Sequence, residues 1–127
     1  MKIFGIGTDI VQINRLKKVL KKRSSLSRLF STHEISRCQK TNKSFNCFAK
    51  RFAAKEAFSK ALGTGISKGI HFNQIVVLNE KNGKPFIKLY DQTKKKVEKK
   101  LKKKKYKISL SLTDEDKYAV AFVTISV

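Results

Sequence analysis

Apolar residues recur along the first third of the chain with periods that predict one strand and two helices. The apolar run at 2–8 predicts a buried strand, in which glycines allow another backbone to come close. Apolar residues recur every three or four positions over 13–20, which is the period of a helix. Ser31 and Glu34 have the spacing of a capping box, so a short helix is expected to begin there and to end near Cys38.

The second half of the chain predicts two hairpins separated by a helix. Apolar residues at 75–78 and 85–90 flank Asn82-Gly83, a dipeptide that favours a tight turn, and these segments therefore predict the first hairpin. Asp91 is placed to cap the helix that follows. The apolar members of that helix are Val97 and Leu101.

Two more strands close the chain and decide the fold class. Residues 106–112 alternate between apolar and polar, which is typical of a half-buried strand, whereas 118–127 are apolar on both faces. The last strand is therefore expected in the middle of a sheet. The order of strand, helices, hairpin, helix and hairpin favours an α+β fold with an antiparallel sheet. With 127 residues the chain is expected to form one domain over 1–127.

The segment 51–62 predicts a long buried helix that is apolar nearly all round and ends in a glycine loop. It is rich in good helix formers, and Gly63 stands where a left-handed C-terminal cap residue is expected. Ala53, Ala57 and Ala61 fall on one line of this helix, so another backbone can pack close against them. Because such a helix is mostly buried, its charged residues need partners or a function.

Spacing alone leaves two interpretations open for each candidate functional group. Glu56 either pairs with Lys60 four residues later, which is the commoner arrangement, or belongs to an active site. Asp9 either caps the helix after the first strand or binds a metal at the strand end. The turn Gly63-Thr64-Gly65 either only ends the helix or wraps phosphate oxygens with its backbone N–H groups.

The formal net charge of +21 at pH 7 indicates an anionic partner, unless it reflects codon bias. Nine lysines fall between 94 and 105, and a face so charged is usually solvated surface, although it can also dock an acidic partner. A basic RNA- or ribosome-binding protein without enzymatic activity is the alternative. No aromatic residues interleave the lysines and no RNA-binding motif is present, so no nucleic-acid partner is expected.

The chain carries no signal for a membrane or for a structural metal. No apolar run approaches the roughly 20 residues of a membrane helix, so no membrane partner is expected. Cys38 and Cys47 lack the spacing of a zinc site. Two free thiols fit a reducing compartment, which predicts a cytoplasmic location.

Three motifs resemble the holo-acyl-carrier-protein synthase family of 4′-phosphopantetheinyl transferases. They are RFAAKEAFSKALGTGI at 51–66, GIGTDI at 5–10 and NGKP at 82–85, and the resemblance runs from near Ile3 to near Val123. The resemblance implies transfer of 4′-phosphopantetheine from coenzyme A to a serine of apo acyl carrier protein. The products are the holo carrier protein and adenosine 3′,5′-bisphosphate.

The resemblance also implies roles for individual residues. Asp9 and Glu56 match the positions that hold Mg²⁺ against the pyrophosphate of coenzyme A. Glu56, or a water on the metal, takes the proton of the attacking serine, and Lys60 steadies the transferring phosphate. The expected contacts to coenzyme A are Arg51, Lys55, Gly63, Thr64, Gly65, Lys84 and Pro85.

Partners and assembly follow from the same resemblance. The carrier protein is acidic as a class, and a basic face formed by Arg15, Lys18 and Lys21 is expected to dock it. A cyclic homotrimer is implied, with an active site at each subunit boundary. One departure is clear, because Leu112 stands where many relatives carry a His, so no His near that strand can act as a base or contact the ligand.

Overall fold

The computed structural model describes residues 1–65 and 69–127, so Ile66 of the 51–66 motif lies outside the described residues. The described residues form two antiparallel sheets and five α-helices, as expected for an α+β fold. The elements in chain order are β1 (Ile3–Gln12), α1 (Ile13–Val19), α2 (Arg23–Leu29), α3 (Thr32–Gln39), α4 (Ser44–Leu62), the 3₁₀ turn η1 (Phe72–Gln74), β2 (Ile75–Asn79), β3 (Pro85–Leu89), α5 (Asp91–Leu101), β4 (Lys107–Asp114) and β5 (Tyr118–Ser126).

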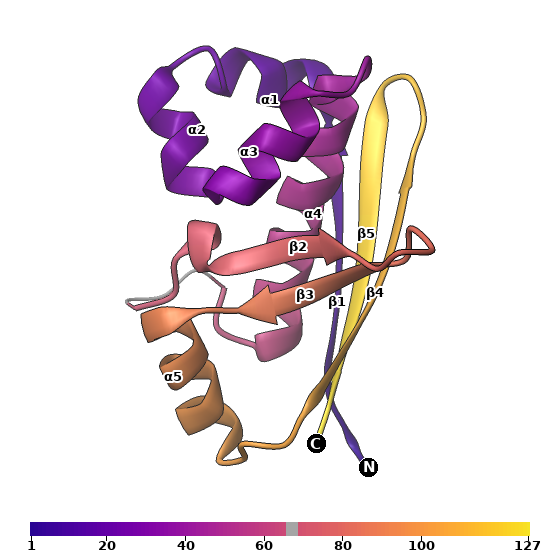
Figure 1. The fold of residues 1–127 in the computed structure, drawn as a ribbon. Coiled ribbons are helices and arrows are strands. Elements are labelled where there is room, and N and C mark those ends of the chain that lie inside the picture. Colours follow the sequence, from indigo (N-terminus) through magenta and orange to yellow (C-terminus); the bar gives the residue numbers. More distant parts are fainter. Residues whose placement is uncertain (66–68) are drawn as a thin grey trace.

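Helix α4 lies at the centre of the molecule, as the alanine-rich segment predicted. It packs against the three-stranded sheet, whose order is β1-β5-β4, and the β2–β3 hairpin crosses it on the other side (Figure 1). Strand β5 is the middle strand, which confirms the expectation from its apolar sequence. Helices α1, α2 and α3 gather around one end of α4, while the two chain termini lie together at the other end of the sheet (Figure 1).

Strand β1 and helix α4 approach each other more closely than side chains would allow. A Cβ atom built on Gly5 would overlap the carbonyl oxygen of Ala61, and one built on Gly7 would overlap that of Ala57. Glycines on the strand and alanines on the helix therefore let the two backbones touch. The helix ends at Gly63, whose φ of 86° is left-handed as predicted.

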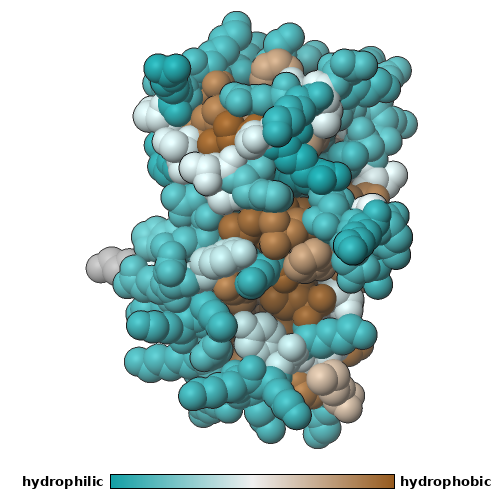
Figure 2. Space-filling view, in the orientation of Figure 1, coloured by the Kyte–Doolittle hydropathy of each residue, from teal (hydrophilic) through white to brown (hydrophobic). Residues whose placement is uncertain are grey.

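The outer face of the three-stranded sheet is apolar and open to solvent. On this face, 57% of Ile6, 64% of Ile10 and 47% of Phe122 are exposed to solvent. Strand β1 was expected to be buried, but only the face towards α4 is covered. Figure 2 shows the side that carries the β2–β3 hairpin, where apolar residues gather in the middle and hydrophilic residues surround them. No helix in the described part of the chain is long and apolar enough to span a membrane.

The cap alternative for Asp9 is excluded, and the cap predicted at Asp91 is wrong. Strand β1 continues to Gln12, which precedes α1, so Asp9 lies within the strand and is not an N-cap. Asp91 is the first residue of α5 and follows the cap residue Tyr90; no cap hydrogen bond is formed by a side chain. By contrast, Ser31 and Glu34 form the predicted capping box at the start of α3.

Cys38 and Cys47 are joined by a disulfide that links the end of α3 to the start of α4, with 5.4 Å between their Cα atoms. The expectation of two free thiols is therefore wrong. The cysteines are nine positions apart in sequence, and the packing of α3 against α4 brings them together. The cytoplasmic location was inferred from free thiols, and without that support it stays a prediction.

Candidate active site

Asp9 and Glu56 line the same pocket, at the edge of the sheet formed by β1. The pocket has a volume of about 400 Å³ and is enclosed by β1, α1 and α4. Asp9 comes from the strand and Glu56 from the helix, and the contact of Gly7 with Ala57 sets the spacing between the two elements. The apolar side chains of Leu16, Val19 and Phe52 complete the wall. Two carboxylates thus face one cavity, as the metal-site interpretation requires.

Lys60 pairs with Asp9 rather than with Glu56. Its Nζ lies 3.2 Å from Oδ1 of Asp9 and also donates a hydrogen bond to the carbonyl oxygen of Thr8 at 3.0 Å. The alternative in which Glu56 pairs with Lys60 is therefore excluded. Within residues 1–65 and 69–127, the Glu56 side chain makes no ion pair or hydrogen bond. Lys60 is half exposed, so its ammonium group remains accessible to a ligand.

Burial makes negative charge unfavourable on both carboxylates. It raises the pKa of Asp9 above its ordinary value of 3.8, although the hydrogen bond and charge of Lys60 act in the opposite direction. Burial also raises the pKa of Glu56 above 4.5, and the negative charge of Asp9 raises it further, while Lys60 lowers it. The site therefore has a deficit of positive charge that a bound cation would remove.

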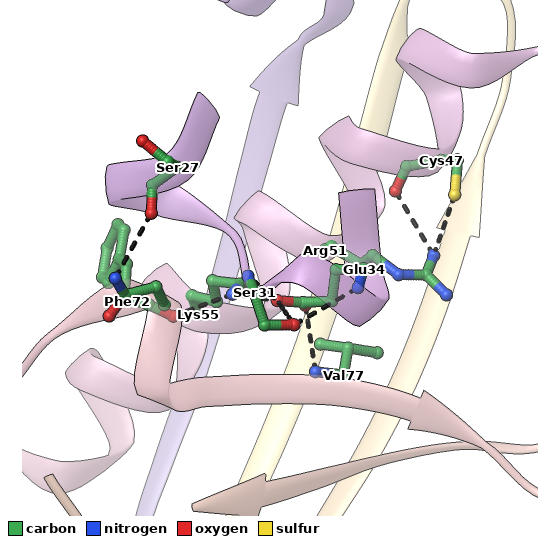
Figure 3. Close-up of polar contacts among 9 residues, drawn as sticks. Ser27, Ser31, Glu34, Cys47, Arg51, Lys55, Phe72 and Val77 are labelled. Carbon is green, nitrogen blue, oxygen red and sulfur yellow. Dashed lines mark hydrogen bonds and ion pairs between the residues drawn. The ribbon is translucent and has the colours of Figure 1, made fainter. Parts of the chain in front are cut away.

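Lys55 does not line this pocket, although it is the neighbour of Glu56 on α4. Its side chain is fully buried, and its Nζ lies 2.7 Å from Oε1 of Glu34 and 2.8 Å from the carbonyl oxygen of Phe72 (Figure 3). Burial lowers the pKa of Lys55 to about 8, although the charge and hydrogen bond of Glu34 raise it. The ammonium group is thus enclosed by protein groups, and the expected contact of Lys55 with coenzyme A stays a prediction.

Arg51 belongs to a second, basic pocket of about 430 Å³ at the β4 edge of the sheet. Its Nη2 donates to Oδ1 of Asn79 at 2.9 Å, and Asn79 in turn donates to the carbonyl oxygen of Gly83 at 3.0 Å. The structure therefore joins Arg51 to the turn of the NGKP motif but not to Asp9. Burial lowers the pKa of Arg51, and its Nε has no hydrogen-bond partner among the described residues. Three further cations line the pocket, namely Arg37, Lys43 and Lys50.

The other expected coenzyme A contacts lie in two separate places. Gly63, Thr64 and Gly65 follow α4, where Gly65 also has a positive φ, of 59°. Lys84 is exposed in the turn between β2 and β3, and Pro85 begins β3. Neither group lines the pocket of Asp9 and Glu56.

The position where many relatives carry a His is occupied by Leu112 of β4. It pairs with Ala121 of β5 and is half-buried on the face towards α4. A leucine has no titratable group, so this strand position supplies no base.

The basic face expected to dock the carrier protein begins at the rim of the acid pocket. Arg15 and Lys18 are exposed on α1, and Arg15 lines the pocket. Lys21 is also exposed but follows the end of the helix at Val19. The face is thus continuous with the site, although only two of its three predicted residues belong to the helix.

Glu34 is a buried charged residue that sequence reasoning assigned only to a helix cap. Its Oε1 accepts hydrogen bonds from the Ser31 backbone at 3.0 Å and from Lys55, and its Oε2 accepts one from the backbone N–H of Val77 at 3.0 Å (Figure 3). The capping signature was visible in the sequence. The partners on α4 and β2 are 21 and 43 residues away, and no local spacing points to them.

Comparison with known proteins identifies the family of this chain. Residues 5–123 match the 4′-phosphopantetheinyl transferase superfamily. The holo-[acyl-carrier-protein] synthase of Pelagibacter ubique is 46% identical, over 98% of this chain and 98% of its own length. That of Bartonella bacilliformis is 41% identical, over 97% of this chain and 95% of its own length.

Solved structures show the same fold. The holo-[acyl-carrier-protein] synthase of Neisseria meningitidis superposes with a TM-score of 0.87 at 35% identity, covering 98% of this chain and 99% of that one. The Helicobacter pylori enzyme, solved in complex with coenzyme A, superposes with a TM-score of 0.79 at 34% identity. The match covers 95% of this chain and 99% of that one. With its fold and nearly its whole length matched, this chain belongs to the 4′-phosphopantetheinyl transferase superfamily.

Proposed function

We propose that this chain is a holo-acyl-carrier-protein synthase, which transfers 4′-phosphopantetheine from coenzyme A to a serine of apo acyl carrier protein. The observation that carries the proposal is the meeting of Asp9 and Glu56 in one pocket of a chain whose relatives have this activity. The products are the holo carrier protein and adenosine 3′,5′-bisphosphate. This function uses the acid pair, which the RNA-binding alternative leaves without a role.

The acid pair fits a magnesium ion. Mg²⁺ is typically held by one or two carboxylates together with substrate phosphates and water. Asp9 and Glu56 supply two carboxylates whose negative charge is not fully balanced by nearby cations. The described residues contain no cluster of three or more His, Cys, Asp or Glu side chains, so substrate oxygens would complete the coordination. When bound, the ion would neutralise charge on the pyrophosphate of coenzyme A.

The protein groups around the pocket account for proton transfer and charge. The serine oxygen of the carrier protein attacks the phosphorus that bears pantetheine, and the bond from that phosphorus to the 3′,5′-ADP oxygen breaks. The raised pKa of Glu56 suits it to accept the serine proton. Lys60, which is half exposed beside Asp9, can move its ammonium group onto the transferring phosphoryl oxygens.

In a single chain, the cations of the Arg51 pocket lie away from the acid pair. The acid pair lies at the β1 edge of the three-stranded sheet and the Arg51 pocket lies at the β4 edge. If copies pack through the apolar outer face around an axis, the β1 edge of one meets the β4 edge of the next. We therefore propose a cyclic homotrimer in which Arg51 and Lys84 of one copy bind coenzyme A phosphates beside the acid pair of its neighbour. The exposed Ile6, Ile10 and Phe122 support this packing.

The carrier protein is proposed to dock on α1 and the turn after it. Arg15 and Lys18 offer positive charge at the rim of the pocket, where an acidic surface would bring its serine to Glu56. The apolar wall formed by Leu16, Val19 and Phe52 lies between the docking face and the acid pair.

Two single substitutions test this assignment of the site. Asp9→Ala and Glu56→Ala are expected to abolish the release of adenosine 3′,5′-bisphosphate from coenzyme A, because each removes a carboxylate of the pair. Both carboxyls are partly exposed rather than part of the core, so circular dichroism is expected to show an intact fold. Near wild-type release by either variant, with unchanged dependence on Mg²⁺, would remove that residue from the metal site.

A further inference from the structure

We propose that the buried ion pair of Glu34 and Lys55 is a positioning device that fixes the rotation of α4 and so holds Glu56 against Asp9. The inference rests on the proposed function, since it assigns both residues a role in that reaction. Glu34 and Lys55 do not line the acid pocket, and they act only through the helix that carries Glu56.

Glu34 ties α4 to two other elements at once. Its side chain is fully buried, and its two oxygens accept hydrogen bonds from Ser31 of the α3 cap, from Lys55 of α4 and from the backbone of Val77 in β2 (Figure 3). A carboxylate with this many fixed donors has little freedom to move. It therefore provides a rigid anchor outside α4.

Lys55 completes the anchor from the side of the helix. Its Nζ also donates to the carbonyl oxygen of Phe72 at 2.8 Å and lies 5.1 Å from the centre of the Phe30 ring. Lys55 thus points in one direction only. Glu56 is the next residue, and because successive side chains on a helix are about 100° apart, a fixed direction for Lys55 also fixes that of Glu56.

The other contacts of α4 constrain its rotation less. The disulfide of Cys47 and the hydrogen bond of Arg51 to Asn79 hold α4 five or more residues before Glu56. Lys60 reaches Thr8 and Asp9 through a half-exposed side chain. The rest of the helix meets alanine methyl groups, glycine backbone and mostly apolar side chains. Apolar contact is non-directional. A carboxylate roughly 6 Å from the helix axis moves about 1 Å for every 10° of rotation, and a misplacement of about 1 Å can lower a catalytic rate roughly 100-fold.

Stability alone is a poor explanation of the pair. Buried ion pairs can often be replaced by apolar residues of similar size without loss of stability, because removing both charges from water is itself unfavourable. This property provides a test that separates positioning from folding. The double variant Glu34→Leu with Lys55→Met keeps the volume of the buried site but removes the directional bonds.

The test measures folding, catalysis and metal binding in the same double variant. Thermal unfolding is expected to show a folded protein. The kcat for transfer is expected to fall about tenfold or more, with KM for coenzyme A within about threefold of wild type, because substrate contacts are unchanged. Mn²⁺ binding, followed by electron paramagnetic resonance without substrate, is expected to weaken by a similar factor.

A matched control comes from another buried polar group. Thr93 of α5 is fully buried and hydrogen-bonds the backbone N–H of His71 and the side chain of Gln74. Thr93→Val breaks these bonds away from α4 and is expected to lower stability while leaving kcat and Mn²⁺ binding unchanged. A folded double variant that loses less than about tenfold in kcat, or binds Mn²⁺ as wild type does, overturns the proposal.

If the double variant does not fold, Glu34→Gln provides the same test. Glutamine keeps one acceptor oxygen but cannot accept hydrogen bonds from both Lys55 and Val77 through oxygen. A folded Glu34→Gln protein with wild-type kcat and Mn²⁺ affinity overturns the proposal. Failure of the wild-type chain to transfer phosphopantetheine would instead contradict the proposed function, so the two failures are distinguishable.

Discussion

Replacing Gly7 with alanine is expected to separate the acid pair without touching either carboxylate. Gly7 lies on β1 two residues before Asp9, and it faces Ala57, the neighbour of Glu56 on α4. An added Cβ would overlap the carbonyl oxygen of Ala57 and lie 2.8 Å from the backbone nitrogen of Ala61. These are backbone atoms of a helix interior, so no side chain can rotate away to make room.

The size of the effect follows from this overlap. Non-bonded heavy atoms prefer to lie about 3.5–4.0 Å apart, so relieving the overlap with the Ala57 oxygen requires β1 and α4 to separate by roughly 1.5–2 Å. Overpacking of this kind costs about 1–3 kcal/mol of unfolding free energy. At about 2.1 cal/mol/K of unfolding entropy per residue, that loss lowers Tm by roughly 4–11 °C. The same displacement of Asp9 from Glu56 is expected to lower kcat about 100-fold.

The assay compares Gly7→Ala with an equally destabilised control. Val97 is fully buried in α5. Val97→Ala is expected to cost on the order of 2 kcal/mol, with no effect on β1 or α4. Both variants are measured well below their Tm for kcat of adenosine 3′,5′-bisphosphate release. A Gly7→Ala protein that keeps the kcat of Val97→Ala would show that the spacing of β1 and α4 does not govern the site.

Three further predictions concern charge, docking and assembly. Burial raises the pKa of Glu56 in the folded protein above its ordinary 4.5, so the contribution of Glu56 to stability falls as pH rises through the folded pKa. Glu56→Gln is therefore expected to raise Tm at pH 7, and this gain is expected to shrink towards pH 4.5. An unchanged Tm at pH 7 would refute the charge deficit at the site. Reversing Arg15 and Lys18 to glutamate is expected to raise KM for the carrier protein and leave KM for coenzyme A nearly unchanged; equal effects on both substrates would exclude this face. Sedimentation at physiological salt is expected to show a trimer at micromolar concentration; a fully active monomer would refute both the trimer and the shared site.

Much of the fold could be predicted because it follows local periods. The alanine line and Gly63 correctly predicted the position and end of α4, and the apolar sequence of 118–127 correctly predicted a central strand. The end of β1 was misjudged, because polarity at Asp9 was taken as a boundary while the strand continues to Gln12. Asp9 lies on the covered face of β1 but lines a pocket there, so its polarity does not end the strand.

The site could be predicted only where a motif carried it. Asp9 and Glu56 are far apart in sequence, and they meet because the backbones of β1 and α4 are in contact. The resemblance implied that the two residues meet, whereas composition could not predict it. Spacing suggested that Glu56 pairs with Lys60, but the neighbouring strand offers Asp9 at a better position. The ion pair of Lys55 with Glu34 was not predicted, because Glu34 lies on an element that spacing does not relate to α4.

The intact mass of apo acyl carrier protein after incubation with this protein tests the central claim most directly. With coenzyme A and Mg²⁺ present, the carrier is expected to gain the mass of one phosphopantetheine group on its serine. With a chelator in place of Mg²⁺, or with Glu56→Ala in place of the wild-type chain, no gain is expected. A carrier protein whose mass stays unchanged with the folded wild-type chain, coenzyme A and Mg²⁺ would contradict the proposed function.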